Sequence, residues 1–356
     1  MIDRLNTLRA QIDALDKEIL KLINQRAAHA HEIGQIKEGA VYRPEREAQV
    51  LRRIKELNPG PLSAEAAARL FREIMSACLA LEKKLSVAYL GPAGTFSEAA
   101  AVKHFGHAAE TIACDSIDQV FRSAEAGETD YCVVPVENST EGAVSRTLDL
   151  LPRMHLRICG EVVLRIHHHL LAKEADTPYS AIRRIYSHSQ SLAQCHEWLH
   201  ANLPNVERIA TSSNAEAARV AASEPGAVAV AGDMAAERYG LQPLARNIED
   251  EPNNTTRFLV LGKHETSRSG KDKTSLVMSA RNVPGAVHGL LDPFARHGVS
   301  MTKFESRPSR TELWEYLFFV DIEGHVQDEV IVKALAELQK KVAFLKVLGA
   351  YPVAVL

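Results

Sequence analysis

VAYL (87–90) runs directly into GPAGTFSEAA (91–100), and this stretch decides the fold of the central part of the chain. The first four residues are an apolar run typical of a strand, and a glycine-containing turn follows them. Thr95 and Glu98 have the spacing of a capping box, which predicts that a helix begins directly after the turn. A strand, a turn and a helix in this order indicate an α/β domain.

The same alternation continues to about residue 262. YCVVPV (131–136) leads into ENSTEG, RRIYS (183–187) into HSQSLAQC, and AVAVAG (227–232) into a further helical stretch. Ser213 and Glu216 have the spacing of a second capping box. This pattern predicts two α/β lobes with a cleft between them over residues 86–263.

Residues 1–85 have no strand pattern and predict a helical domain. One apolar face repeats at intervals of three and four residues: Leu5, Leu8, Ile12, Leu15, Ile19 and Leu22. Because the first proline is Pro44, we expect one long helix, a second from Pro44 to about Leu57, and a third capped by Ser63. A first helix of this length suggests a dimer in which long helices pack across subunits. A coiled-coil oligomerisation arm is the alternative.

Beyond the α/β pattern, GKHETSRSGKDK (262–273) is polar and glycine-containing, which predicts a linker. Residues 274–356 then show the order βαββαβ, which is typical of a ferredoxin-like α+β domain.

Composition narrows the classes of partner. The net charge is −3, which favours neither a nucleic-acid nor a membrane partner, whereas residues 1–85 alone carry +3 and favour small anionic ligands. The five cysteines are scattered without a CxxC pair, which indicates reduced thiols. No apolar run approaches the roughly 20 residues of a membrane span, and the charged N-terminus lacks a signal-peptide core. We therefore expect a cytoplasmic protein.

Residues 1–85 resemble the all-helical class of chorismate mutase. The matching positions are Arg9 in LRAQIDALD, Arg26 in LINQRAAHA, Lys37 in IGQIKE, Arg46 and Glu47 in RPERE, and Glu82 in the third helix. The resemblance implies catalytic roles for Arg26, Lys37 and Glu82 and substrate binding by Arg9, Arg46 and Glu47. It also implies an intertwined dimer in which Arg9 reaches the other subunit's site.

Helical geometry gives this resemblance independent support. Arg26 and Lys37 are eleven residues apart, so on one helix they lie about 20° apart around the axis and roughly 16 Å apart along it. Arg9 points about 100° away from Arg26, which agrees with service in another subunit. Two such cations suit a rearrangement without proton transfer, in which the protein holds two carboxylates and stabilises charge on the ether oxygen. Relatives often carry Gln where Glu82 stands, and a glutamate donates to that oxygen only when protonated.

Residues 87–262 resemble prephenate dehydratase through GPAGTFSEAA, VVPVENSTEG (133–142), YSHSQSLAQC (186–195), TSSNAEAARVAA (211–222) and NNTTRFLVLG (253–262). The resemblance implies catalytic roles for Asn138, Ser187, Gln194 and Thr256. It places Thr95, Glu137 and Arg257 at the substrate. Because loss of carbon dioxide and the ring hydroxyl makes prephenate aromatic, neutral donors that orient the ring and help the hydroxyl leave are sufficient.

Two other sites are less favoured by the same sequence. HHH (167–169) lies in a strand pattern, where neighbouring side chains point to opposite faces and cannot all reach one metal ion. Ser187 and His188 are adjacent in a strand without a preceding glycine elbow, which disfavours a hydrolase. We therefore expect no metal and no cofactor.

Residues 274–356 resemble an ACT domain, with PGAVHGLL (284–291) at its first turn and helix and ESRP (305–308) after its second strand. Related domains bind free phenylalanine there, at a subunit interface. The implied effector residues are Gly285, Ala286, Val287, Glu305, Ser306, Arg307 and Pro308. We expect a cut after about Lys263 to spare catalysis and to remove inhibition by phenylalanine.

Together these patterns predict a bifunctional enzyme: a helical mutase (1–85), a two-lobed dehydratase resembling periplasmic binding proteins (86–263) and an ACT domain (274–356). Its partners would be chorismate, prephenate, L-phenylalanine and at least one further copy of the chain. The alternative is a two-lobed protein that binds a small anion or regulates a partner without catalysis.

Overall fold

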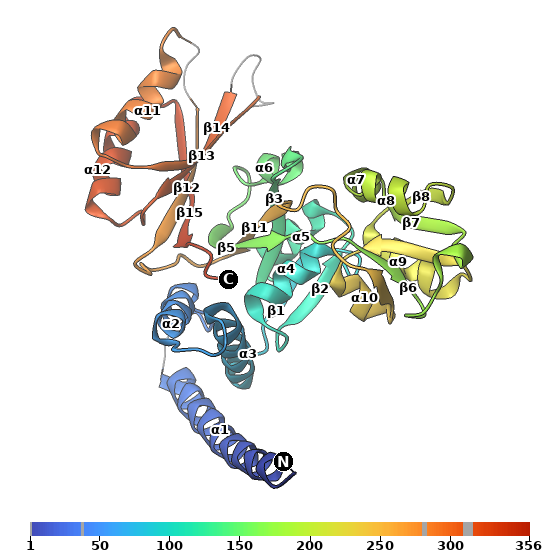
Figure 1. Cartoon of the computed structure of the whole chain (residues 1–356). Coiled ribbons are helices and arrows are strands. Elements are labelled where there is room, and N and C mark those ends of the chain that lie inside the picture. Colours follow the sequence, from blue (N-terminus) through green and yellow to red (C-terminus); the bar gives the residue numbers. More distant parts are fainter. Residues whose placement is uncertain (1, 37–38, 280–282, 309–315) are drawn as a thin grey trace.

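The computed structural model describes residues 2–36, 39–279, 283–308 and 316–356. A helical part, two α/β lobes and a C-terminal domain follow one another along the chain, and α1 projects away from the rest (Figure 1). The helical part contains α1 (Ile2–Ile36), α2 (Pro44–Leu57) and α3 (Ala64–Glu82). Pro44 is the first residue of α2, and the Ser63 hydroxyl caps α3 by accepting from the Ala66 N–H at 3.1 Å. The three expected helices are confirmed.

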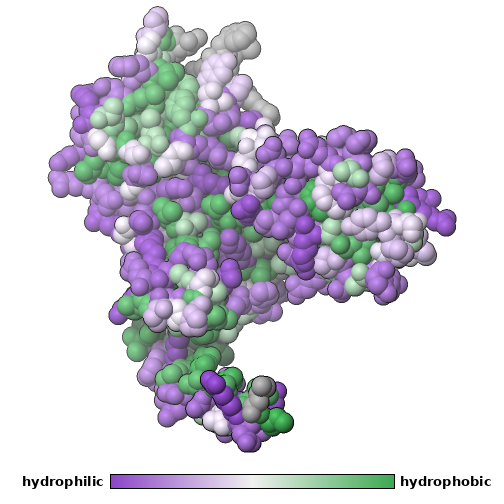
Figure 2. All heavy atoms as spheres, viewed as in Figure 1, coloured by the Kyte–Doolittle hydropathy of each residue, from purple (hydrophilic) through white to green (hydrophobic). Residues whose placement is uncertain are grey.

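The described part of α1 has no buried residue. The side chains of its apolar face are between 47% and 57% exposed: Leu5, Leu8, Ile12, Leu15, Ile19 and Leu22. Hydrophobic residues also gather on the surface of the rest of the helical part, around α2 and α3 (Figure 2). This face has a composition suited to burial, but no described residue of a single copy covers it.

The first lobe is built on a six-stranded sheet with the order β2-β1-β3-β11-β5 and β4 paired to β3. Its strands are β1 (Ser86–Leu90), β2 (Glu110–Cys114), β3 (Tyr131–Asn138), β4 (Gly142–Ala143), β5 (Arg157–Arg165) and β11 (Thr255–Gly262). Its helices are α4 (Phe96–Phe105), α5 (Ile117–Ala126) and α6 (Ser145–Leu150). β11 returns from the second lobe and runs antiparallel between β3 and β5.

The second lobe has a five-stranded sheet with the order β10-β6-β9-β7-β8. Its strands are β6 (His169–Ala172), β7 (Arg184–His188), β8 (Glu207–Thr211), β9 (Ala227–Ala231) and β10 (Gln242–Ala245). Its helices are α7 (Ser189–Gln194), α8 (His196–Asn202), α9 (Asn214–Ser223) and α10 (Asp233–Tyr239), with a 3-10 turn at Tyr179–Ala181.

The chain passes between the two lobes twice, at 166–168 and at 246–254. The two passages are hydrogen-bonded to each other, because the Ile166 N–H donates to the Asn254 carbonyl at 2.9 Å and the Ile248 N–H to the His168 carbonyl at 2.8 Å. The two-lobed α/β fold expected from the sequence is confirmed.

The C-terminal domain has one antiparallel sheet with the order β13-β14-β12-β15. Its elements in chain order are β12 (Asp272–Ser279), α11 (Ala286–Arg296), β13 (Met301–Pro308), β14 (Tyr316–Glu323), α12 (Glu329–Leu338) and β15 (Phe344–Pro352). This is the βαββαβ order of the predicted ferredoxin-like fold.

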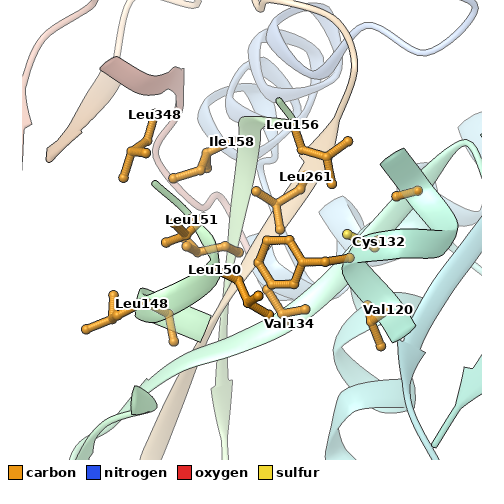
Figure 3. Close-up of a cluster of buried hydrophobic side chains, with 14 of the residues drawn as sticks. Val120, Cys132, Val134, Leu148, Leu150, Leu151, Leu156, Ile158, Leu261 and Leu348 are labelled. Atoms are coloured by element: carbon orange, nitrogen blue, oxygen red, sulfur yellow. The ribbon is translucent and has the colours of Figure 1, made fainter. Parts of the chain in front are cut away.

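The C-terminal domain shares a hydrophobic core with the first lobe. Val277, Phe319, Leu348 and Tyr351 belong to the same buried cluster as first-lobe residues such as Ile158, and the close-up shows Leu348 beside Ile158 (Figure 3). The backbones also approach closely, since a Cβ on Gly349 would lie 2.1 Å from the Ile158 carbonyl oxygen. A cut after Lys263 would strip these side chains from the core. We therefore expect this cut to destabilise the first lobe, and the domain is not packed independently of it.

Of the predicted linker 262–273, residues 263–271 have no regular helix or strand, whereas Gly262 ends β11 and Asp272 and Lys273 begin β12. The segment 263–271 is tightly held. Ser269 is 5% exposed, and Arg52 of α2 donates to the Ser269 carbonyl and hydroxyl, both at 2.8 Å. The segment therefore ties the helical part to the C-terminal domain.

All five cysteines are free and buried. Within the described ranges, no helix is both long and apolar enough to cross a membrane.

Candidate active site

A cavity of about 260 Å³ lies between the two α/β lobes. The first lobe lines it with residues that include Thr95, Phe96, Ser97, Asn138 and Thr256, and the second lobe with residues that include His188, Gln190, Ser191, Gln194, Ser213 and Asn214. His168 and Asn254 line it from the passages between the lobes. None of the described residues around this cavity is Asp, Glu, Lys or Arg. The site is a pocket of neutral hydrogen-bonding groups.

Asn138 and Thr256 face each other across the pairing of β3 and β11. The Asn138 amide nitrogen donates to the Thr256 hydroxyl oxygen at 2.8 Å and to the Asn254 side-chain oxygen at 2.8 Å. The Asn138 oxygen accepts from the Thr140 N–H (3.0 Å) and hydroxyl (2.6 Å), which fixes the orientation of the amide. Because the Thr256 oxygen accepts a hydrogen bond, its own proton can be donated to a ligand in the cavity.

Gln194 joins this pair to the second lobe. Its side-chain oxygen accepts from the Asn254 amide nitrogen at 3.2 Å, and its nitrogen donates to the Thr140 hydroxyl at 3.3 Å. Asn138, Asn254, Gln194 and Thr140 thereby close a ring of hydrogen bonds across the cleft.

His168 supports Gln194 from the wall of the cavity. Its Nε2 lies 3.0 Å from the Gln194 side-chain oxygen, so Nε2 carries the proton and donates it. Burial lowers the pKa of His168, against a smaller opposing effect of the Gln194 hydrogen bond, and the ring stays neutral at neutral pH. His168 is 1% exposed, and its Nδ1 has no partner among the described residues.

The other two histidines of the run have different partners. His167 Nδ1 lies 2.7 Å from Glu249, and His169 Nδ1 accepts from the Asn247 N–H at 3.0 Å. The rings of His167 and His169 stack on each other at 6.5 Å, as expected for alternate residues of an extended segment.

Ser187 lies behind the cavity and is fully buried. Its Oγ is 2.6 Å from the Val230 carbonyl oxygen and 3.0 Å from the Asn214 side-chain oxygen. Asn214 does line the cavity and donates to Ser191 at 2.9 Å. Ser187 is therefore placed to hold Asn214 instead of contacting a ligand directly.

Thr95 lies at the cavity as the N-cap of α4, where its hydroxyl accepts from the Glu98 N–H at 3.4 Å. Glu98 does not close the predicted box onto the Thr95 N–H: its carboxylate accepts from the Gly94 N–H at 2.5 Å and pairs with Arg238 of the second lobe. Ser213 caps α9 in the same way, by accepting from the Glu216 N–H at 3.0 Å. The N-termini of α4 and α9 thus both meet the cavity, which favours bound anions.

The side chains of Glu137 and Arg257 do not line this cavity. Arg257 donates from Nε to Glu161 at 2.8 Å and from Nη1 to Asp321 of the C-terminal domain at 2.6 Å. Glu137 pairs with Lys303 of the C-terminal domain. Both residues adjoin Asn138 and Thr256 in sequence, but both contact the C-terminal domain.

The predicted site residues of the helical part differ in their exposure to solvent. Arg9 and Arg46 are exposed, Arg26 and Glu82 are half-buried, and Lys37 lies outside the described residues. Glu82 of α3 packs against α1 at Gly34, where an added Cβ would lie 2.7 Å from the carboxyl carbon of Glu82.

Glu47 is committed to an ion pair, because its carboxylate lies 2.9 Å from Arg72 Nε and is 14% exposed. Burial raises the pKa of Glu47, and the Arg72 charge opposes that shift. The structure therefore brings Glu47 to the junction of α2, α3 and the first lobe.

The predicted effector residues lie at one end of the C-terminal sheet. Ser279 at the end of β12 pairs with Leu317, which pairs with Arg307 at the end of β13. Gly285, Ala286 and Val287 lie at the start of α11, which follows β12. ESRP does not follow the second strand as predicted but forms its end, since Glu305, Ser306, Arg307 and Pro308 are the last residues of β13. Arg307 also donates to Ser145 at 2.9 Å and to Asp149 at 3.1 Å, both on α6 of the first lobe.

Comparison with known proteins agrees with each part of this architecture. Residues 8–83 match the family model of chorismate mutase type II, residues 87–266 that of prephenate dehydratase and residues 274–339 that of the ACT domain. The bifunctional chorismate mutase/prephenate dehydratase of Neisseria gonorrhoeae is 61% identical over 98% of this chain and 97% of its own length. This chain belongs to the bifunctional chorismate mutase/prephenate dehydratase family.

Two solved structures resemble the dehydratase and ACT domains together. A prephenate dehydratase from Arthrobacter aurescens in complex with L-Phe is 36% identical, with a TM-score of 0.69, over 75% of this chain and 90% of its own. A protein described as a quorum quenching acylase, GqqA, is 29% identical with the same TM-score, over 76% of this chain and 98% of its own.

Two residues of the hydrogen-bond ring, Asn254 at the cavity and Thr140 beside it, do not follow from the motifs alone. Both lie inside the quoted motifs, but nothing in a linear motif distinguishes a residue that bridges the lobes. His168 belongs to the histidine run, but the sequence does not show the burial that lowers its pKa and keeps the ring neutral. Only the cleft between two lobes brings these groups to one cavity.

Proposed function

We propose that this chain rearranges chorismate to prephenate in its mutase domain and converts prephenate to phenylpyruvate in its dehydratase domain, under feedback by phenylalanine through the ACT domain. The observation that carries the proposal is the hydrogen bond from Asn138 to Thr256 inside a cavity without charged lining residues. A threonine hydroxyl held as an acceptor offers its proton to a leaving hydroxyl, which is the assistance that the dehydratase reaction needs.

In the dehydratase step the bond from the ring to its carboxylate breaks and releases carbon dioxide. The electrons of that bond enter the ring, and the hydroxyl at the opposite ring carbon leaves as water after taking up a proton. Thr256 would hydrogen-bond to this hydroxyl. The N-termini of α4 and α9, capped by Thr95 and Ser213, would hold carboxylate groups.

Gln194 would present its remaining amide N–H to the substrate. The His168 and Asn254 donors both engage the Gln194 oxygen, so the amide nitrogen is the group left to face Thr140 and the cavity. Ser187 would act through Asn214, because its hydroxyl is already engaged and buried. The same engagement argues against Ser187 as a nucleophile.

In the mutase domain, Arg26 and Lys37 would bind the two carboxylates, with Arg46 on α2, Glu82 on α3 and the partner subunit's Arg9 completing the site. Charged donors around the ether oxygen would stabilise the transition state without any proton transfer. Glu47 would contribute through the oxygen that Arg72 does not occupy.

A homodimer built on α1 fits this arrangement. The exposed apolar face of α1 would be covered by a second copy, which would also deliver Arg9. Phenylalanine would bind where the start of α11 meets the end of β13, and Arg307 would link that site to α6 of the dehydratase domain. A cytoplasmic location agrees with five buried, unpaired cysteines.

One assay tests the two activities and the feedback. The purified chain is incubated with chorismate, with and without L-phenylalanine, while chorismate absorbance and phenylpyruvate are followed. We expect loss of chorismate, appearance of phenylpyruvate and a lower rate with phenylalanine. A two-lobed protein that only binds or regulates would produce neither change.

A further inference from the structure

Two neighbouring residue pairs on β3 and β11 serve two different parts of the molecule. Thr256 pairs with Asn138, and Arg257 pairs with Glu137, in consecutive positions of the antiparallel ladder. The first pair lines the dehydratase cavity and the second does not. Successive side chains of a strand point to opposite faces of the sheet, so the second pair sits directly behind the first.

Arg257 is held at three points, two on the ACT sheet and one on Glu161 of the first lobe. Arg257 Nη1 donates to Asp321 of β14 at 2.6 Å, and Nη2 donates to the Tyr351 hydroxyl of β15 at 2.9 Å. The third nitrogen, Nε, donates to Glu161 of β5 at 2.8 Å. Lys273 of β12 also binds Glu161, at 2.9 Å. The guanidinium is thereby fixed between the dehydratase and ACT domains.

Glu137 is held by the remaining strand of the ACT sheet. Its carboxylate pairs with Lys303 of β13 and lies 3.8 Å from Arg257 Nη1. All four ACT strands therefore supply a side chain to this cluster.

The centre of the cluster is buried, and its charges are balanced. Glu161 is 3% and Asp321 7% exposed, and the Ser275 hydroxyl donates to Asp321 at 2.5 Å. Burial opposes the charge of Arg257, but Tyr351, Asp321 and Glu161 outweigh that effect and raise its pKa above the ordinary value. Removal of one buried partner leaves a charge without compensation, so the remaining side chains must shift.

The backbone beside the cluster is irregular. The register of β3 and β11 shifts here: Arg257 pairs with Glu137 but Phe258 pairs with Pro135, which leaves Val136 of β3 as the extra residue of a bulge beside Glu137. A bulge next to an active site aims neighbouring side chains, and Arg257 is bonded directly to Thr256. A movement of Arg257 is therefore passed to the catalytic hydroxyl through a single peptide unit.

We propose that Arg257 and Glu137 are positioning residues of the dehydratase reaction, through which the ACT sheet sets the geometry of Thr256 and Asn138. Asp321 and Lys303 are the ACT side chains that hold this pair. This assignment replaces the contact with substrate expected from the sequence. It rests on the proposed dehydratase function and names a physical route from the ACT domain to the catalytic pair.

The test uses the full-length chain with Asp321→Asn and Lys303→Met. Neither residue lines the cavity, so a purely local effect on substrate binding is not expected. The matched control is Lys346→Met, because Lys346 also crosses the same domain interface, where it donates to the carbonyls of Pro152 and Met154 at 2.9 and 2.6 Å. The measurements are kcat and KM for prephenate, and chorismate mutase activity in the same samples.

We expect a fall of at least about tenfold in dehydratase kcat for both variants, with KM within about twofold of the wild type. The mutase activity of all three variants should stay at the wild-type level. The dehydratase kcat of Lys346→Met should also stay at that level. Wild-type turnover of prephenate tests the proposed function by itself. Given that turnover, an unchanged kcat in the two variants, or an equal loss in Lys346→Met, overturns the positioning role. If Asp321→Asn loses mutase activity through misfolding, Lys303→Met decides alone, since its partner Glu137 is 40% exposed.

Discussion

The amide nitrogen of Asn138 lies 2.8 Å from the hydroxyl oxygen of Thr256, and this hydrogen bond leaves the threonine proton available inside the dehydratase cavity. Thr256→Ala removes that donor. We expect dehydratase kcat to fall by about 10²–10³. Chorismate mutase activity should be unaffected, because Thr256 lies in a separate domain.

Thr256→Ser is the matched variant for this prediction. It keeps the hydroxyl and should retain most of the dehydratase activity, whereas Thr256→Val keeps the shape and should behave like Thr256→Ala. Comparable rates in Thr256→Val and the wild type would remove the hydroxyl from the mechanism. Loss of mutase activity in the same variants would argue against separate sites.

His168 supplies the next prediction through its hydrogen bond to Gln194. His168→Phe keeps an aromatic ring but leaves the Gln194 oxygen with one donor fewer. A hydrogen bond of this kind contributes about 1 kcal/mol, which corresponds to about a fivefold fall in kcat. The control is His167→Phe, because His167 belongs to the same run but contacts Glu249.

A double-mutant cycle separates positioning from general damage to the cavity. If His168 acts through Gln194, the losses in His168→Phe and Gln194→Leu will not add in the double variant. Strictly additive losses would show that the two side chains work independently.

Local sequence patterns correctly predict where several helices of this fold begin. Ser63, Thr95 and Ser213 cap the helices that their spacing predicted, because an N-cap depends on a few adjacent residues. The Thr256 and Asn138 motifs were also placed correctly at one cavity.

The directions of Glu137 and Arg257 could not be read from the same motifs. Alternation says only that they face away from Asn138 and Thr256, and the packing of the whole ACT sheet decides what lies on that side. Ser187 is a similar case, because β7 is an inner strand of its sheet and the residue is covered by the second lobe. The shared core around Leu348 could not be predicted, because a polar linker separates the α/β pattern from the ferredoxin-like pattern in the sequence.

His104 predicts a loss of stability in mild acid. Burial lowers its pKa to about 3, and Tyr42 hydrogen-bonds to its Nε2 at 3.0 Å. The folded protein keeps His104 neutral, whereas the unfolded chain takes up a proton below about pH 6.5. Stability therefore falls as the pH drops from about 6.5 towards 3, by about 2 kcal/mol at pH 5 for this group.

The measurement is urea unfolding at pH 7 and pH 5. His104→Phe should reduce the difference between the two free energies of unfolding, while His155→Gln, at an exposed position, should leave it as in the wild type. An identical pH dependence in His104→Phe and the wild type would contradict the assignment.

Glu82 predicts that the mutase reaction needs a hydrogen-bond donor at this position of α3. A carboxyl group donates to the ether oxygen of chorismate only in its protonated form, whereas an amide donates in its neutral form. Glu82→Gln should therefore retain mutase activity, and Glu82→Ala, which removes the donor, should lose it. The dehydratase activity of the same variants is the internal control, and full mutase activity in Glu82→Ala would remove this role.

The apolar face of α1 predicts that the mutase depends on a second copy of the chain. Full burial of one Leu or Ile side chain contributes about 1.5–3 kcal/mol, and Leu8 and Leu15 are 49% and 57% exposed in one copy. Leu8→Asp combined with Leu15→Asp should therefore dissociate the proposed dimer, as measured by light scattering. Because the partner subunit's Arg9 would be withdrawn, and a charged hydrogen bond contributes about 1.5–3 kcal/mol, mutase kcat/KM should fall at least about tenfold. Lys17→Asp changes the opposite face of α1 and should preserve both the dimer and the mutase. A monomeric double variant with full mutase activity would show that each copy holds a complete site.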